Sequence, residues 1–136
     1  MTDKELLLKD LCARLPYGVK AMEHEDEPPF TIDSYDKADF IDGDNWIDSD
    51  GWNHNITKTK PYLFPLSSMT ESQNDSWRDA FLNDLAMSAT INYPESEKYL
   101  ALSHFKSMEW LYKHHFDVNG LIEKGLALDA TGLGIY

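Results

Sequence analysis

The sequence predicts a single α+β domain: an N-terminal helix, a small antiparallel β-meander or half-barrel, and two to three C-terminal helices. Three observations favour this class. Apolar residues recur at helical spacing near the N-terminus, short apolar pairs alternate with turn residues over residues 18–58, and helical spacing returns in residues 71–136. The length suffices for one hydrophobic core, so we expect residues 1–136 to fold as one domain.

Residues 1–17 predict a helix of about residues 3–14. Thr2 and Glu5 have the spacing of a capping box, in which each side chain accepts a hydrogen bond from the other residue's backbone N–H. Pro16 then ends the helix. Leucines and a cysteine form an apolar stripe, and polar residues are expected on the solvent side; these polar residues are Lys4, Lys9, Asp10 and Arg14.

Cys12 is the only cysteine, so no intrachain disulfide can form. Its place in the apolar stripe predicts a buried, inert thiol in a reducing compartment. Residues 1–20 show no signal peptide, and no apolar run reaches the roughly 18 residues of a membrane span. The sequence therefore predicts a cytoplasmic protein.

Residues 18–58 predict an acidic β region of three to five short strands. Asp42-Gly43 and Asp50-Gly51 are dipeptides typical of two-residue hairpin loops, because type I′ turns require a positive φ at both central residues. The charged run at residues 24–27 stands beside two prolines and is expected to be a solvated turn.

Residues 59–70, which we call the proline pivot, join the β region to the helical part. Pro61 and Pro65 exclude a helix, because proline lacks the backbone N–H and restricts the residue before it. The apolar residues between them predict a connector pressed onto the core. Ser68 and Glu71 have capping-box spacing and predict the start of the next helix.

Residues 71–136 are expected to be mainly helical. One apolar stripe predicts a helix that ends near residue 85, and a second predicts a helix of about residues 103–115. Residues 117–120 then resemble a turn, and Gly125 could cap a short helix. The tail, residues 126–136, either docks as a strand or extends into solvent.

The negative charge is concentrated in one quarter of the chain. The net charge is −12, and residues 21–53 contain eleven acidic residues against one lysine, Lys37. Such a surface repels nucleic-acid phosphates and membrane lipids and attracts basic proteins. We therefore expect neither direct nucleic-acid binding nor membrane binding.

The acidic region predicts a non-catalytic binding protein. Carboxylates along a hairpin can imitate the charges of a nucleic-acid backbone, so we expect docking on a basic protein such as a nuclease or DNA-binding protein, with an inhibitory effect. Interleaved aromatic residues could anchor the interface. No catalytic residue, cofactor or metal is predicted, and the oligomeric state is open; the predicted partner-binding residues are Asp42, Asp44, Trp46, Asp48, Asp50 and Trp52.

Three alternatives stay open. A small metal-dependent enzyme could use His104, His114 or His115 with nearby carboxylates. An assembly protein could form oligomers through the apolar residues 62–66. A cation site could use the aspartates of the hairpin turns, but an EF-hand register that places Gly51 at position 6 puts Trp46 at position 1, which excludes that motif.

Several stretches resemble a family of small uncharacterised proteins from gut bacteria and their prophages. They are LKDLCARLPYGVK (residues 8–20), KPYLFPLSSMT (60–70), HHFD (114–117), GLI (120–122) and GLA (125–127). Together they cover about a third of the chain, and the acidic residues 21–58 are outside them. The resemblance implies a phage or mobile-element setting, such as anti-defence, and implies no activity, cofactor or catalytic residue.

Overall fold

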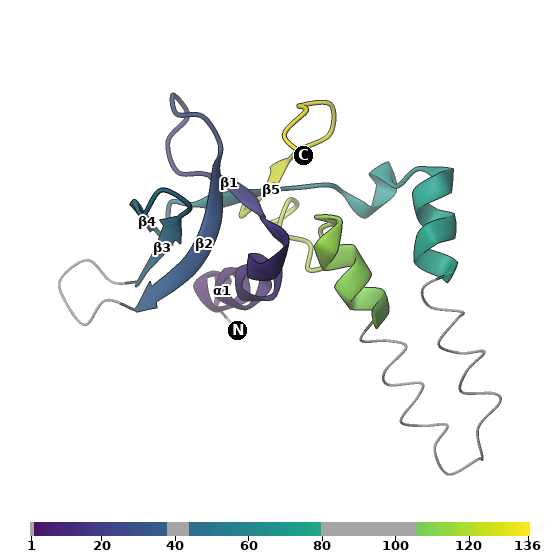
Figure 1. Ribbon diagram of the computed structural model, residues 1–136, viewed down its shortest axis with the longest axis horizontal. Coiled ribbons are helices and arrows are strands. Elements are labelled where there is room, and N and C mark those ends of the chain that lie inside the picture. Colours follow the sequence, from purple (N-terminus) through teal and green to yellow (C-terminus); the bar gives the residue numbers. More distant parts are fainter. Residues whose placement is uncertain (1, 38–43, 80–105) are drawn as a thin grey trace, which may run out of the picture.

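Helix α1 (Asp3–Arg14) packs against a six-stranded sheet in the computed structural model, which describes residues 2–37, 44–79 and 106–136 (Figure 1). The class predicted from the sequence, mixed α and β, is confirmed. Leu7 and Leu11 of the helix enter one hydrophobic cluster with apolar residues of the sheet. The core therefore lies between α1 and the sheet.

The ends of α1 agree with the sequence prediction. The Thr2 hydroxyl accepts a hydrogen bond from the Glu5 N–H at 3.1 Å, and the Glu5 carboxylate accepts one from the Thr2 N–H at 3.4 Å. A 3₁₀ turn, η1 (Leu15–Tyr17), then ends at Gly18, whose φ of 69° is the left-handed conformation that glycine adopts without strain.

The predicted faces of α1 are partly wrong. Cys12 is exposed, whereas Asp10 and Arg14 are fully buried. The buried positions 7, 10, 11 and 14 recur at i, i+3, i+4 and i+7 and share one helix face, whereas Cys12 lies on the opposite side. The buried face contains an i,i+4 ion pair that satisfies its own charges, and a binary apolar pattern does not detect such a pair.

Strands β1 (Lys20–Met22), β2 (Phe30–Lys37), β3 (Asp44–Asp48) and β4 (Asn53–Asn55) form the predicted antiparallel meander. The sheet order is β4-β3-β2-β1-β5-β6. The β3–β4 connection differs from the predicted two-residue loop: Asp48 N–H donates to the Trp52 carbonyl, so residues 49–51 form a three-residue loop with Gly51 at φ 88°. The Asp42-Gly43 turn lies outside the described residues.

The proline pivot is part of the sheet. Strand β5 (Lys60–Leu63) pairs antiparallel with β1, and Pro61, Tyr62 and Leu63 are buried. The expectation of an apolar segment against the core is confirmed, but the segment is a strand. It ends in a 3₁₀ turn, η2 (Leu66–Ser68).

The next helix begins later than the predicted capping box. Residues 71–79 are helical, and the box is formed by Thr70 and Gln73: the Gln73 N–H donates to the Thr70 hydroxyl at 3.1 Å, and the Thr70 N–H donates to the Gln73 side chain at 2.9 Å. The Ser68 hydroxyl instead donates to the Pro65 carbonyl. Residues 106–113 are also helical, whereas residues 121–125 form turns instead of the expected short helix.

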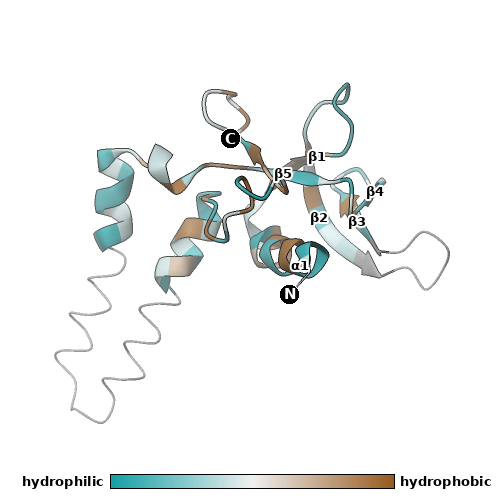
Figure 2. Ribbon diagram, turned by 180° about the vertical axis from the view of Figure 1, so that it is seen from behind, coloured by the Kyte–Doolittle hydropathy of each residue, from teal (hydrophilic) through white to brown (hydrophobic). Residues whose placement is uncertain are grey.

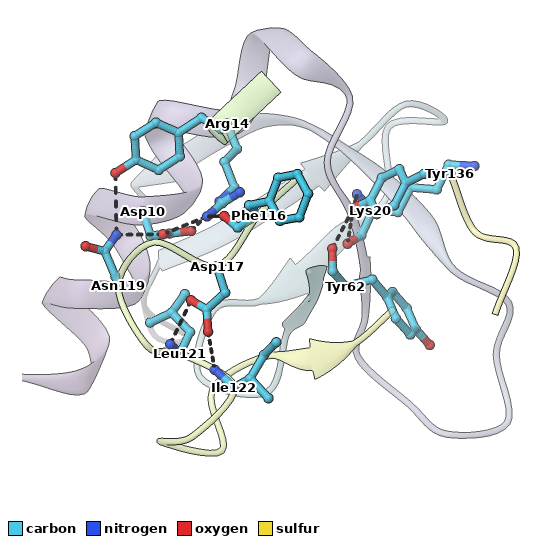
Figure 3. Close-up of polar contacts among 11 residues, drawn as sticks. Asp10, Arg14, Lys20, Tyr62, Phe116, Asp117, Asn119, Leu121, Ile122 and Tyr136 are labelled. Carbon is cyan, nitrogen blue, oxygen red and sulfur yellow. Dashed lines mark hydrogen bonds and ion pairs between the residues drawn. The ribbon is translucent and has the colours of Figure 1, made fainter. Parts of the chain in front are cut away.

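The C-terminal tail docks on the sheet. Strand β6 (Leu128–Asp129) pairs parallel with β5. Beyond it, the Tyr136 hydroxyl donates to the Tyr62 carbonyl at 2.7 Å and accepts from the Lys20 N–H at 2.8 Å (Figure 3). The last residue thus bridges β5 and β1, and of the two predicted arrangements the docked one is present.

A buried polar network joins α1 to the C-terminal segment (Figure 3). Arg14 Nε donates to Asp10 Oδ1 at 2.6 Å, and Arg14 Nη2 donates to the Phe116 carbonyl at 2.6 Å. Asn119 donates to the other oxygen of Asp10 at 2.7 Å, and the Arg14 guanidinium lies 4.8 Å from the centre of the Tyr112 ring. The network therefore joins α1 to residues 116–119 within the core.

Candidate functional site

A cleft of about 530 Å³ lies between the β1–β2 loop and the β3–β4 hairpin. Both elements are predominantly hydrophilic (Figure 2). Three of the predicted partner-binding residues line the cleft, namely Asp48, Asp50 and Trp52. The β1–β2 loop adds Glu23 and Glu27, which places four carboxylates around one cavity.

His54 forms the buried base of the cleft. Its Nε2 lies 2.7 Å from Asp48 Oδ2, and its Nδ1 lies 3.8 Å from Glu23 Oε1. The imidazole stacks on the Phe30 ring, with 3.6 Å between ring centroids and 9° between the planes. The base is therefore a histidine between two carboxylates, positioned by strands β2, β3 and β4 and by the end of β1.

Asp48 holds the β3–β4 hairpin together. Its Oδ1 accepts hydrogen bonds from the backbone N–H groups of Asp50 at 2.9 Å and Trp52 at 3.0 Å. Burial by itself would raise the pKa of Asp48, but the hydrogen bonds from His54 and from the two N–H groups outweigh it and lower the pKa. Asp48 is thus an ionised structural carboxylate whose oxygens are all in use.

Glu23 ties the β1–β2 loop to β4. Its Oε2 accepts a hydrogen bond from the Asn55 N–H, and its Oε1 lies 2.9 Å from His24 Nε2. This carboxylate therefore sets the position of the loop relative to the hairpin, and with it the width of the cleft.

The rim of the cleft is acidic and aromatic. The carboxylates of Glu27 and Asp50 are exposed and make no hydrogen bond or ion pair with any part of the chain that the structure describes. Trp52 is 72% exposed. Among the described lining residues the one amine is Lys20 Nζ, which donates to the Ile135 carbonyl at 3.1 Å. The rim can therefore accept hydrogen bonds and positive charge.

The six predicted partner-binding residues separate into three groups. Asp50 and Trp52 lie on the surface, as expected. Trp46 is 0% exposed and packs against Tyr35 in the core. Asp48 is buried and hydrogen-bonded to His54, so neither side chain is available to a partner. Asp42 and the side chain of Asp44 lie outside the described residues.

Sequence reasoning missed most of the cleft. The run at residues 24–27 predicts only a solvated turn, yet Glu27 lines the same cleft as Asp50. His54 and Phe30 carried no signal as single residues. Phe30 lies at the start of β2 and His54 lies within β4. Their stacking could be predicted only from the register of the β3–β4 hairpin, which the sequence does not show.

The C-terminal histidines do not converge. His114 stacks on Trp110, with 4.2 Å between ring centroids, whereas His115 stacks on Tyr136 at 3.7 Å. Over residues 2–37, 44–79 and 106–136, no three His, Cys, Asp or Glu side chains are grouped so that they could hold a metal ion. His104 lies outside the described residues.

Burial lowers the pKa of His115 to about 4, with the positive charge of Arg14 as the next cause. His115 is thus a neutral packing residue at neutral pH. Within the described parts of the chain, no helix is both long enough and apolar enough to cross a membrane.

Comparison with known proteins returned no match: no protein-family model, curated protein or solved structure is significantly similar to this chain.

Proposed function

We propose that this protein is a non-catalytic acidic binding protein that docks on a basic protein surface. One observation carries the proposal: four carboxylates and an exposed tryptophan surround a cleft, and the described residues of its lining include a single amine. Such a surface suits lysine-rich and arginine-rich partners and repels phosphate. Nucleic-acid-binding proteins, including nucleases, present basic surfaces of this kind, so inhibition by mimicry of nucleic acid is the mode we propose.

The contact is carried by Glu27, Asp50 and Trp52. The two carboxylates lack intramolecular partners, so a partner cation meets no competing ion pair in the described chain. The Trp52 indole supplies a large rigid surface, and tryptophan is enriched at the energetic centres of interfaces. Trp46 and Asp48 act indirectly, because they shape the hairpin that presents these groups.

The setting we propose is the cytoplasm of a bacterium that carries a phage or another mobile element, with an anti-defence role. Support comes from the resemblance of residues 8–20, 60–70 and 114–117 to small proteins of gut bacteria and prophages. Arg14 and Phe116, from two of these stretches, meet in the buried network. The resembling residues thus build the scaffold, and the acidic cleft lies mainly outside them.

A charge-reversal experiment tests the docking. The variant Glu27→Lys/Asp50→Lys is compared with Asp79→Lys/Glu123→Lys, which makes the same change in net charge at exposed positions outside the cleft lining. Both variants and the wild type serve as bait for bacterial lysate. We expect the wild type and the control to capture basic nucleic-acid-binding proteins that added duplex DNA displaces, and the cleft variant to lose them.

Salt gives a second criterion, because an electrostatic contact weakens as ionic strength rises. Equal capture by all three baits, or captured proteins that duplex DNA does not displace, would contradict the proposal. A variant that reverses all four predicted aspartates, Asp42, Asp44, Asp48 and Asp50, is unsuitable, since lysine at Asp48 would remove three hydrogen bonds of the hairpin.

A further inference from the structure

We propose that the acidic cleft is a binding site for a guanidinium group, supplied by an arginine side chain of the partner. This inference rests on the proposed docking function and specifies its central contact. The cavity of about 530 Å³ is large enough for an arginine head group. The argument depends on the hydrogen-bond chemistry at the base of the cleft and on the groups at its rim.

No donor from the part of the chain that the structure describes reaches His54 Nδ1 at the base of the cleft. Asp48 is ionised and can only accept, so the proton in the 2.7 Å contact belongs to His54 Nε2. In the neutral imidazole, Nδ1 is then an acceptor, and it is buried without a hydrogen-bond partner among the described residues. Glu23 Oε1, at 3.8 Å from Nδ1, is an acceptor as well, and its own near contact is His24 Nε2 at 2.9 Å.

His54 Nδ1 and Glu23 Oε1 are two acceptors only 3.8 Å apart, and no hydrogen-bond donor in the described chain satisfies Nδ1. His54 is only 8% exposed, so bulk water does not supply the missing donor to its ring. Glu23 is already in contact with His24 Nε2 and the Asn55 N–H, so the unmet group is the lone pair of His54 Nδ1. The unpartnered Nδ1 is an observation separate from the acidic residues of the loop, and it indicates a ligand that donates hydrogen bonds.

The rim favours a guanidinium over an ammonium. Glu27 and Asp50 provide two further carboxylates without partners in residues 2–37, 44–79 and 106–136, and Trp52 provides an exposed aromatic face. A guanidinium is planar, carries five N–H donors and stacks on aromatic rings, so it can contact carboxylates at its edge and an indole at its face. An ammonium offers three donors and is more strongly hydrated.

The test uses three short peptides that differ at one side chain. The central residue is arginine, lysine or citrulline, and citrulline has nearly the shape of arginine without its charge. Nuclear magnetic resonance (NMR) titration follows the Trp52 indole N–H and the His54 ring protons. We expect saturable shifts with the arginine peptide, weaker binding of the lysine peptide and no saturable shift with citrulline.

Two variants localise the contact. Glu27→Gln/Asp50→Asn removes both unpartnered charges without touching the hydrogen bonds of Asp48, and we expect the dissociation constant of the arginine peptide to rise at least about tenfold. Glu25→Gln neutralises a carboxylate on the same loop but outside the cleft lining. It should change the dissociation constant of the arginine peptide by less than about twofold, because solvent screens the charge. Equal binding of citrulline, or no effect of the cleft variant, would overturn the inference.

The same titration reports the protonation of His54. A doubly protonated ring at pH 7 in the unliganded protein, together with no binding of the arginine peptide, would show that a proton fills the gap and would overturn the inference. Capture of basic proteins together with no binding of the arginine peptide would also overturn the guanidinium site, while the docking function would stand. A bound arginine peptide with no captured basic protein would overturn the docking function and leave the guanidinium site standing.

Discussion

Arg14 Nη2 donates a 2.6 Å hydrogen bond to the backbone carbonyl of Phe116, 102 residues along the chain. The same nitrogen and Nε also contact the Asp10 carboxylate, so one guanidinium joins α1 to itself and to the C-terminal segment. All of these groups are removed from water. The ion pair is therefore part of the core, and its partners depend on each other.

Arg14→Ala should be strongly destabilising. It leaves the Asp10 carboxylate buried, with Asn119 as its remaining hydrogen-bond partner, and the expected loss in the free energy of unfolding is about 3–5 kcal/mol. Urea denaturation of the variant measures it. The double variant Asp10→Leu/Arg14→Met removes both charges and should recover part of this loss; a double variant less stable than Arg14→Ala would contradict this account.

Asp48→Ala should loosen the β3–β4 hairpin. The variant loses hydrogen bonds to His54 and to two backbone N–H groups, and we expect a loss of about 2–4 kcal/mol at pH 7. Because folding lowers the pKa of Asp48, its stabilising effect is present above the unfolded pKa and is lost as the pH falls through the folded value, below 3.8. The difference between wild type and variant in urea denaturation should therefore shrink at pH 3.

The matched control is Asp50→Ala, which changes a neighbouring exposed carboxylate that has no partner in the described chain. It should alter stability by less than about 0.5 kcal/mol. The free energy of unfolding of Asp48→Ala is compared with that of the wild type at each pH. If the difference were the same at pH 7 and pH 3, the carboxylate would not be the stabilising group.

His115→Asn should flatten the acid dependence of stability. Folding lowers the pKa of His115 from 6.5 to about 4, so the stability that neutral His115 contributes is complete above the unfolded pKa and is lost as the pH falls towards 4. The total effect is on the order of 3 kcal/mol. Asparagine does not titrate, and it tolerates the φ of 65° that His115 adopts.

Melting temperatures of wild type and His115→Asn between pH 7 and pH 4 measure this effect. The melting temperature of the wild type should fall more steeply with decreasing pH than that of the variant, because only in the wild type does unfolding expose a neutral imidazole that takes up a proton. Parallel curves would assign the acid sensitivity to other groups.

Tyr136→Phe should weaken the attachment of the tail. The variant loses the hydrogen bonds to the Tyr62 carbonyl and from the Lys20 N–H, and the expected loss is about 1–2 kcal/mol. The ring that stacks on His115 is retained, so the packing is unchanged. Amide hydrogen exchange should show faster exchange at Lys20; unchanged protection there would contradict the proposed attachment.

Cys12 should react with a maleimide reagent in the folded protein. The residue is exposed on α1, and partial burial raises the pKa of its thiol, so we expect complete but slow labelling at pH 7. Mass spectrometry under native conditions measures it. Labelling that requires denaturant would restore the buried thiol that the sequence pattern suggested.

Local signals in the sequence predicted the parts of the fold that local chemistry decides. Thr2 and Glu5 cap α1 as predicted, and the meander follows from short apolar pairs and turn residues. Asp10 and Arg14 were assigned to the wrong side because their burial depends on Phe116 and Asn119, which are remote in sequence. A pattern of polarity cannot show that two charges satisfy each other.

The candidate site was predicted in part for the same reason. Asp50 and Trp52 lie on the surface of the acidic hairpin, but Trp46 faces the core because alternate strand residues point to opposite sides of the sheet. The expected turn contained two residues and the observed loop contains three, and such a shift changes which side chains face outwards. The contribution of Glu23 depends on a contact across 32 residues, with Asn55.

The parallel pairing of β5 with β6, and the contact of Arg14 with Phe116, also determine when this chain can fold. On the ribosome, α1 and the meander emerge long before the carbonyl that Arg14 requires and before the strand that covers β5. Contacts of such sequence separation slow folding, because a long loop must close before they form. The nascent domain therefore completes its core only after synthesis of its final segment, and until then the unpaired edge of β5 is exposed to chaperones and to neighbouring chains.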